Sequence, residues 1–299
     1  MKLLGVWLAL ASLLLAFDYQ LKPQDVGEGI YCYFGKPEVM DTNNNGNMVN
    51  SCFVDMGKEW LVIDSGPTYL YAKEAYAQIC RIKELPVKHV INTHVHDDHW
   101  LGNGYYKELG ATILGSSAFE EISPDEATRM QNRISAQAYV LTSPKIPDRY
   151  IQGEKKISIA NETLILKHVE GSAHSHSDLY LYLPSRKALF AGDLVFNDRI
   201  PSLRDGDISG WISVLEGIKN MDLNIIVGGH GVRTDKQAAD FTLAYLKEMK
   251  QGIKEVLARG GDLSDAVKSL RMGTYENSKF YEEAHRANIN AAFQMLEWE

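Results

Sequence analysis

Polar side chains crowd into one short segment that directly follows a predicted buried strand. The strand is Val87–Asn92, and the residues after it read Thr93-His-Val-His-Asp-Asp-His99. Packing does not explain three histidines and two aspartates so close together, because apolar neighbours cannot supply the hydrogen-bond partners that buried polar groups require. A metal ion can supply them, and we interpret the segment as a metal-binding motif.

Backbone geometry divides this motif into two pairs of ligands. His94 and His96 are two residues apart on extended backbone, so they project to the same side and can share one ion. Asp98 and His99 follow after the chain has turned, so they can face a second ion. Further candidate ligands end three strand-like segments, whose glycines allow tight turns: Gly171-Ser-Ala-His174, Phe190-Ala-Gly-Asp193 and Val227-Gly-Gly-His230.

The elements that must position these residues are strands and helices in alternation. The first half of the chain predicts strands at Gly29–Gly35, Met48–Asp55 and Trp60–Asp64, a helix at Tyr69–Leu85 and the strand Val87–Asn92. Residues 116–149 are expected to be helical and irregular. The second half predicts strands at Ile157–Ala160, Thr163–Val169, Leu179–Leu183, Ala188–Ala191 and Asn224–Val227, and a helical tail from Thr234. Strands first and helices last in each half indicate an α/β fold.

Composition narrows the classes of function. A chain of 299 residues with 45% apolar residues can form one large α/β domain or two ordinary ones, which excludes disorder, collagen and coiled coil. The net charge of −8 gives no global electrostatic reason to expect nucleic-acid or anionic-membrane binding. The three cysteines include no CxxC pair, so a metal site must use histidine and carboxylate.

The N-terminus predicts export. Lys2 precedes an apolar run, Leu3–Ala16, that is shorter than the roughly 20 residues a membrane span needs. Residues 1–16 are therefore interpreted as a signal peptide, which places the mature chain in the periplasm, with an uncleaved anchor as the alternative. Export would permit a disulfide between Cys32 and Cys52 on neighbouring predicted strands.

Together, the motifs from Asp64 to His230 resemble those of the metallo-β-lactamase superfamily of metallohydrolases, over residues 28–235. The resemblance implies a four-layer αββα sandwich over residues 17–299, with a helical C-terminal extension at about 236–299. It assigns His94, His96 and His174 to a first metal, Asp98, His99 and His230 to a second, and Asp193 to a bridge between them. Asp64 would be a buried carboxylate behind the ligands, or alternatively a turn cap.

The bridging residue separates branches of that superfamily. Zinc β-lactamases of the common acquired type have cysteine at the position of Asp193, whereas the glyoxalase II, arylsulfatase-like and alkylsulfatase-like branches have aspartate. This makes a dedicated β-lactamase less favoured. Phe196 occupies the position where many lactamases carry a lysine for the substrate carboxylate. Arg199 or Arg204 can substitute, but we interpret each as an ordinary surface arginine.

A finer similarity concerns exported zinc metallohydrolases described with quinoprotein relay systems and sulfur oxidation. It rests on the stretch Gly192–Gly206 and on the tail around His285-Arg-Ala-Asn288. The role of that subgroup is poorly defined, so the resemblance names relatives rather than a substrate.

The ligand set predicts a hydrolase with two zinc ions, although its nitrogen and oxygen donors would also accept iron or manganese. A metal-bridging hydroxide would attack the carbonyl of a small-molecule ester, thioester, lactone or β-lactam. Asp98 would ligate the second metal and orient the nucleophile or shuttle its proton. Two alternatives remain open: a β-lactamase proper, and a metal-binding accessory protein of a periplasmic quinoprotein or sulfur-oxidation pathway. The oligomeric state is not predicted.

Two loops and the other histidines complete the sequence predictions. Residues 36–49 match the flap over the site in lactamase relatives, and their Asn and Gly content predicts mobility. His176 is expected at the rim of the site. His89, His168 and His285 are expected to be structural.

Overall fold

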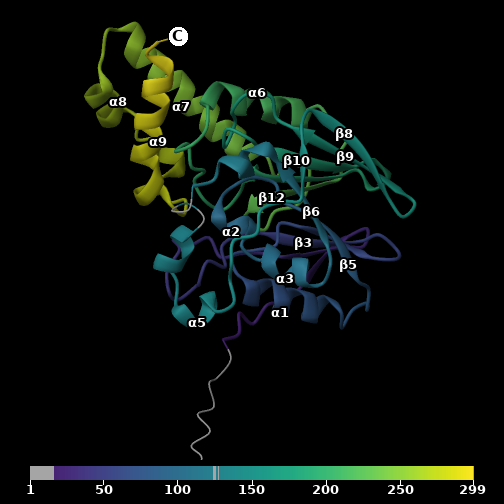
Figure 1. The fold of residues 1–299 in the computed structure, drawn as a ribbon. Helices are drawn as coiled ribbons and strands as arrows, with labels where there is room; N and C mark the ends of the chain where they lie inside the picture. Colours follow the sequence, from purple (N-terminus) through teal and green to yellow (C-terminus); the bar gives the residue numbers. More distant parts are fainter. Residues whose placement is uncertain (1–16, 124–125, 127, 299) are drawn as a thin grey trace, which may run out of the picture.

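Two β-sheets pack face to face, and helices cover the outer face of each sheet (Figure 1). This computed structural model describes residues 17–123, 126 and 128–298. The predicted signal peptide, residues 1–16, lies outside the described residues. The four-layer αββα sandwich that the sequence predicts is confirmed.

The first sheet has seven strands in sequence order, and its second half is parallel. The strands are β1 (Gln24–Gly27), β2 (Ile30–Tyr33), β3 (Ser51–Asp55), β4 (Trp60–Ile63), β5 (Val87–Ile91), β6 (Thr112–Ser116) and β7 (Arg149–Ile151). Neighbours from β1 to β4 are antiparallel, and neighbours from β4 to β7 are parallel. The carboxyl ends of β4 and β5 therefore meet at one edge.

The second sheet has five strands in the order β12-β11-β10-β9-β8. Their bounds are β8 (Glu154–Ile159), β9 (Glu162–His168), β10 (Leu179–Leu183), β11 (Ala188–Phe196) and β12 (Ile225–His230). The only parallel pair in the described part of this sheet is β11 with β12. Its carboxyl ends face the same edge of the sandwich as those of β4 and β5.

Apolar cores lie between each pair of neighbouring layers, and a smaller fourth cluster surrounds Trp100 and Phe119. One lies between the sheets and includes Ile63, Ile91, Phe190 and Val227. Another packs the first sheet against α1 (Tyr69–Ile79) and α3 (Asn103–Glu108). Thr68 caps the N-terminus of α1, and its hydroxyl accepts a hydrogen bond from the Tyr71 amide. The third packs the second sheet against α6 (Ile208–Lys219) and α7 (Asp240–Ala258).

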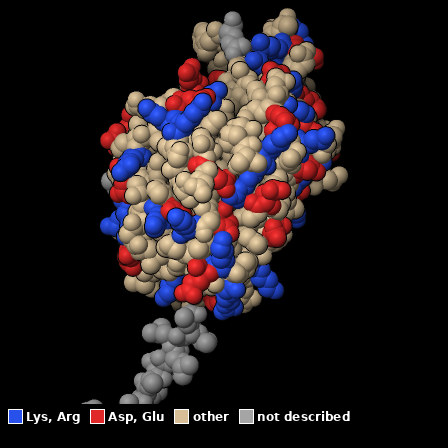
Figure 2. Space-filling model, turned by 90° about the vertical axis from the view of Figure 1, so that its right-hand side faces the viewer, with Lys and Arg blue, Asp and Glu red and all other residues tan. Residues whose placement is uncertain are grey.

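The C-terminal helices extend the second-sheet side of the sandwich (Figure 1). After α7, the chain forms α8 (Leu263–Ser269), the short 3₁₀ helix η4 (Gly273–Tyr275) and α9 (Tyr281–Leu296). Shorter helices elsewhere are α2 (Asp97–Trp100), α5 (Ala136–Tyr139), η1 (Ser117–Glu121), η2 (Arg129–Asn132) and η3 (Pro184–Arg186). Figure 2 shows positive and negative side chains interspersed over the face it draws.

A disulfide joins Cys32 of β2 to Cys52 of β3, which are direct partners in the sheet. Both residues are buried and belong to the core between the sheets. The third cysteine, Cys80, has a free thiol.

Replacing both Cys32 and Cys52 by alanine should lower the free energy of unfolding by about 3 kcal/mol, because the disulfide closes a loop across a separation of 20 residues. Denaturant unfolding of the purified protein measures the difference. Cys80→Ala, which keeps the disulfide, is the matched control and should unfold at a midpoint closer to that of the wild type. An unchanged unfolding midpoint in the double variant would contradict the prediction.

Candidate metal centre

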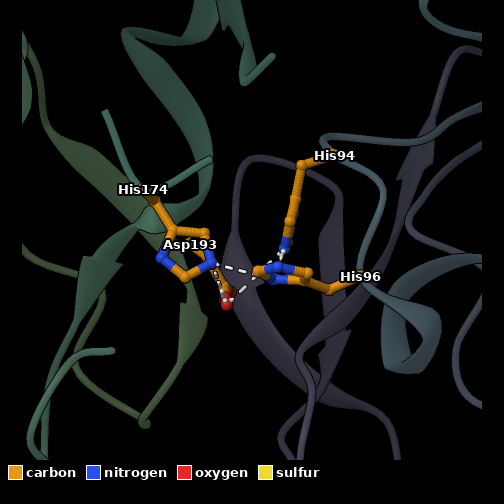
Figure 3. Close-up of side chains that lie close together, drawn as sticks. All are labelled: His94, His96, His174 and Asp193. Carbon is orange, nitrogen blue, oxygen red and sulfur yellow. Dashed lines mark hydrogen bonds and ion pairs between the residues drawn. The ribbon is translucent and has the colours of Figure 1, made fainter. Parts of the chain in front are cut away.

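Strand ends from both sheets bring the predicted ligands into two adjacent groups. The first donor group contains His94, His96, His174 and Asp193 (Figure 3), and the second donor group contains Asp98, His99 and His230. Within each group, one ligand atom from every residue lies within 4.8 Å of the others. The structure thus brings together all the residues that the sequence predicts as ligands.

Local structure explains the division of the first motif. His94 and His96 follow β5, with His96 in extended backbone, and α2 begins at Asp97, with the His99 amide bonded to the His96 carbonyl at 3.1 Å. This helical turn places Asp98 and His99 in the second donor group, with the His99 ring centre 4.2 Å from that of His94. The predicted change of direction is therefore present.

The imidazoles of the first donor group converge on one point. His96 Nδ1 lies 3.0 Å from His94 Nε2 and 2.9 Å from His174 Nε2. Asp193 Oδ2 is 3.3 Å from His174 Nε2 and 3.7 Å from His94 Nε2. In the second donor group, Nε2 of His230 and of His99 lie 3.7 and 3.8 Å from Asp98 Oδ2.

Asp193 connects the two groups. Its Oδ1 lies 3.1 Å from His99 Nε2, and its Oδ2 lies 3.2 Å from His230 Nε2. Because the same carboxylate also approaches His94 and His174, it can face both groups at once. This is the position of a bridging ligand.

Hydrogen bonds leave one ring nitrogen of most of these histidines free to bind a metal. His94 Nδ1 contacts Thr93 Oγ1 at 3.0 Å, and His96 Nε2 contacts Asp205 Oδ2 at 3.1 Å. His230 Nδ1 donates to the Met48 carbonyl at 2.6 Å. In each case the other nitrogen carries the lone pair that points into its donor group, as in metal-binding histidines generally.

Burial and charge oppose each other across the centre. Burial lowers the pKa of His94 well below its ordinary value, and it lowers the pKa of His174 to about 3. These two imidazoles are therefore neutral. For His99, burial also acts to lower the pKa, but the carboxylates of Asp193, Asp98 and Asp64 outweigh it and raise the pKa well above its ordinary value.

The donor set fits metal ions. His99 Nε2 and Asp193 Oδ1 are buried and form no hydrogen bond, although they lie 3.1 Å apart, so both point to a third position. Tetrahedral zinc with nitrogen at about 2.0 Å separates its ligand atoms by roughly 3.3 Å, close to the separations in the first donor group. Five imidazoles and two carboxylates suit zinc, iron or manganese.

The buried carboxylate of Asp64 accepts hydrogen bonds from residues at the metal centre. Asp64 follows β4 with a φ of +54°, and Oδ1 accepts a hydrogen bond from the Thr93 amide at 2.8 Å. Oδ2 accepts from Thr93 Oγ1 and from His99 Nδ1, each at 2.8 Å. The side chain therefore orients ligands of both donor groups, as the first of the two interpretations of this residue predicts.

Gly229 permits the close approach of β12 to β11. A Cβ at this position would lie 1.9 Å from Asp193 Oδ1, which no side chain could accommodate without displacing that carboxylate. The glycines of the Val227-Gly-Gly-His230 segment thus have the role that the sequence suggests.

The structure adds two residues that sequence reasoning did not select. Asp205 accepts the hydrogen bond from His96, and Asp97 is buried in a bidentate pair with Arg129, with Nη2 at 2.6 Å and Nε at 3.1 Å. Asp97 therefore supports the loop beside the motif and is not available as a ligand. Its position in the sequence gives no sign of this difference from Asp98.

A cavity of about 300 Å³ opens over both donor groups. Val39, Met40 and Met48 of residues 36–49 line it, so this segment lies where a flap is predicted. Two of its asparagines hold it to neighbouring backbone: Asn44 Nδ2 donates to the Val39 carbonyl, and Asn45 Oδ1 accepts from the Ser135 amide.

The interpretation of Arg199 as a surface residue is wrong. Only 6% of Arg199 is exposed, and it lines the cavity beside the second donor group. Its burial depends on residues of the C-terminal helices, which no local sequence pattern indicates. The Arg204 side chain, by contrast, is 54% exposed and pairs with Asp205.

The remaining histidines lie outside the donor groups. His176 is exposed and lines a neighbouring cavity of about 530 Å³ that also contains His96, which agrees with its predicted position at the rim. His89 pairs with Glu59, His168 bonds Ser177, and His285 bonds Tyr245 and the Leu270 carbonyl. These partners support their structural roles.

Comparison with known proteins agrees with this architecture. The chain matches the family model of the metallo-beta-lactamase superfamily over residues 44–230. A metallo-beta-lactamase from Pontibacter korlensis shares the fold with a TM-score of 0.60 and 21% identity, over 76% of this chain and 99% of that one. The protein TMB-1 matches with a TM-score of 0.57 and 18% identity, over 76% and 97% of the two chains.

Fold and site together define a metallohydrolase-like α/β sandwich with a histidine- and aspartate-rich centre at the strand ends. The chain belongs to the metallo-β-lactamase superfamily, whose members are generally metal-dependent hydrolases. Its C-terminal helices lie beyond the residues that the family model matches.

Asp64→Asn should weaken metal binding by about 10- to 100-fold, because the amide cannot accept hydrogen bonds at both of its heavy atoms and His99 loses its partner. Asparagine tolerates the positive φ at this position, so the backbone should be kept. Competition with a chromogenic chelator measures the affinity. Asp55→Asn, on β3 and distant from the donor groups, is the control, and equal affinity in both variants would contradict the role of Asp64.

Proposed function

We propose that this protein is an exported hydrolase with two zinc ions that cleaves a small ester, thioester, lactone or β-lactam. The observation that carries the proposal is the pair of adjacent donor groups that share Asp193 beneath an open cavity. The cavity of about 300 Å³ suits a small molecule.

When bound, two divalent ions would supply Lewis-acid activation of water and of a carbonyl group. The chain's own residues would arrange the reactants around them. Asp98 is buried and lines the cavity, so its carboxylate is placed to accept a hydrogen bond from the attacking water and to hold its proton. Phe196 and Met48 line the same cavity and contribute apolar surface to it.

Zinc is the proposed metal because neutral imidazole and carboxylate donors suit it in a protein that encounters oxygen outside the cytoplasm. The expected result of metal analysis on protein purified without chelator is two zinc ions per chain. Elemental analysis by mass spectrometry makes the measurement. Iron or manganese at the same stoichiometry would refute zinc and retain a dinuclear centre, whereas a single ion would refute the dinuclear centre.

The Cys32–Cys52 disulfide supports export, because disulfides persist mainly in oxidising compartments. The apolar run at residues 3–16 supports it independently. None of the helices in the described residues is long and apolar enough to cross a membrane.

Asp98→Asn should reduce kcat by about 10²- to 10⁴-fold on the best substrate, because the amide cannot hold a proton during the attack. Initial rates on a chromogenic cephalosporin, an aryl thioester, a lactone and an aryl ester, with zinc-loaded protein lacking residues 1–16, make the test. Circular dichroism and zinc content show whether the variant retains its fold and metals.

The four substrates separate the possible activities. Turnover of the cephalosporin that the variant loses would identify a β-lactamase, and turnover of another substrate would identify that class instead. No turnover of any substrate by protein that holds two zinc ions would overturn the proposed hydrolase.

A further inference from the structure

The chain that precedes β1 lies against the flap of the cavity. Residues 17–21, here called the N-terminal strap, belong to no helix or strand. Glu74 of α1 holds the strap, because its carboxylate accepts hydrogen bonds from the Tyr19 amide at 2.6 Å and from the Leu21 amide at 2.5 Å. The Leu21 side chain is buried in the core between the first sheet and its helices. The strap is therefore fixed to the outer helical layer of the first sheet.

Aromatic rings of the strap pack beside the flap. Phe17, Tyr19 and the flap residue Met40, which lines the cavity, all pack against the fourth apolar cluster. The Tyr19 ring makes edge contacts with the rings of Phe17 and Tyr71, at 4.8 and 5.3 Å between ring centres. These contacts fix the direction in which the Tyr19 hydroxyl points.

The Tyr19 hydroxyl meets a tight turn within the flap. Residues 44–47, here called the flap turn, are closed by a hydrogen bond from the Asn47 amide to the Asn44 carbonyl at 2.9 Å. Asn45 and Gly46 at its centre have φ angles of +49° and +80°, the two positive values that a type I′ turn requires. Tyr19 Oη donates to the Asn45 carbonyl at 2.9 Å, which belongs to the peptide bond between these two residues.

This hydrogen bond supplies a partner that the turn cannot supply itself. The central carbonyl of a tight turn points away from the bond that closes the turn, and Asn45 is buried, so the carbonyl needs another donor. Thr68 Oγ1 also lies 2.9 Å from Tyr19 Oη. Because the only hydroxyl hydrogen of Tyr19 goes to Asn45, Thr68 donates to Tyr19. Burial raises the pKa of Tyr19, which keeps the phenol protonated.

The flap turn in turn supports a ligand of the second donor group. The Met48 amide donates to the Gly46 carbonyl at 2.8 Å, and the Met48 carbonyl accepts from His230 Nδ1 at 2.6 Å. Gly46 fits closely between Pro67 and Met130, since an added Cβ would lie 2.9 Å from an atom of each. The position of the carbonyl that orients His230 therefore depends on the flap turn.

We propose that Tyr19 is a positioning residue that fixes the flap turn and, through the Met48 carbonyl, orients His230 toward the second metal. The N-terminal strap precedes residues 44–230, which match the family model, so this support comes from outside the matched residues. A flap held in this way moves less than its asparagine and glycine content predicts. The inference rests on the proposed function in its last step alone, because only that step requires a second metal ion.

Hydrogen exchange measured by mass spectrometry tests the hold on the flap turn, in metal-free and in zinc-loaded protein lacking residues 1–16. Tyr19→Phe keeps the ring and removes only the hydroxyl. The amides of residues 45–48 are all hydrogen-bonded, and in this variant they should exchange about 2- to 10-fold faster, as expected when a locally opening segment loses one hydrogen bond. The amides of β5 should exchange as in wild type.

Two further variants make this test specific. Tyr76→Phe is the matched control, because Tyr76 also lies beside α1's core and its hydroxyl donates to the Leu85 carbonyl at 3.0 Å, away from the flap. Exchange at residues 45–48 should stay at the wild-type rate in this control. Glu74→Gln serves if Tyr19→Phe does not fold, since it leaves one acceptor oxygen for two strap amides and should also speed exchange in the flap turn.

Competition with a chromogenic chelator tests the link to His230. Tyr19→Phe should weaken the binding of one zinc ion by about 2- to 10-fold, less than the change of about 10- to 100-fold for a direct partner of a ligand. The other ion should bind as in wild type. The affected ion should be the one that His230→Ala also weakens. A general loss of stability would instead weaken both ions and speed exchange in β5 as well.

Unchanged exchange at residues 45–48 in Tyr19→Phe, or an equal increase in Tyr76→Phe, would overturn the inference. Faster exchange of the flap turn with both zinc affinities changed alike, or with neither changed, would overturn the link to His230. Faster exchange in a protein that binds a single ion, or that hydrolyses none of the substrates above, would refute the proposed function and retain the hold of Tyr19 on the flap turn.

Discussion

The crowding of Asp193 among buried imidazoles is the constraint on which the rest of this structure depends. Its carboxylate approaches His94, His174, His99 and His230, and the imidazoles hold its pKa well below the ordinary value against the effect of burial. The ring nitrogens of His94, His96 and His230 that face away from the centre have their own hydrogen-bond partners, so the lone pairs of the other ring nitrogens converge within it. A buried polar group without a partner costs about 1–3 kcal/mol. Cations between its members would satisfy these lone pairs, which agrees with the family's general use of metal ions.

The sandwich meets that constraint by placing strand ends from both sheets at one edge. The second donor group draws on both halves of the chain, since Asp98 and His99 follow β5 and His230 ends β12. Neither half could assemble the centre alone. The apolar core between the sheets therefore does more than stabilise the fold, because any shift of one sheet against the other would separate ligands of the same ion.

Sequence reasoning succeeded where local pattern determines the outcome. Strand β10 has its predicted bounds, Leu179–Leu183, and the turn before Asp98 follows from the spacing of the motif. It failed where distant contacts decide. Strand β11 continues to Phe196 beyond the predicted end at Ala191, because Gly192 and Asp193 interrupt the apolar run and yet are buried by β12. Helix α6 was not predicted, and its glycines at 210 and 217 weaken the helical pattern that tertiary packing completes.

Arg199 shows the same limit at the level of function. Within its own segment it stands beside Asp198 and near Arg204, as a surface arginine would, and nothing there indicates burial. The side chain that covers it and the amide that holds its loop come from the far end of the chain, with Asn288 and Pro201 separated by 87 residues. Residues 44–230, which match the family model, contain the donor groups and so indicate the class of chemistry. Residues after the match, such as Phe280, influence which charged side chains are buried at the cavity. In this protein the donor groups lie within the residues that match the superfamily, and part of the cavity lining comes from the C-terminal residues beyond them.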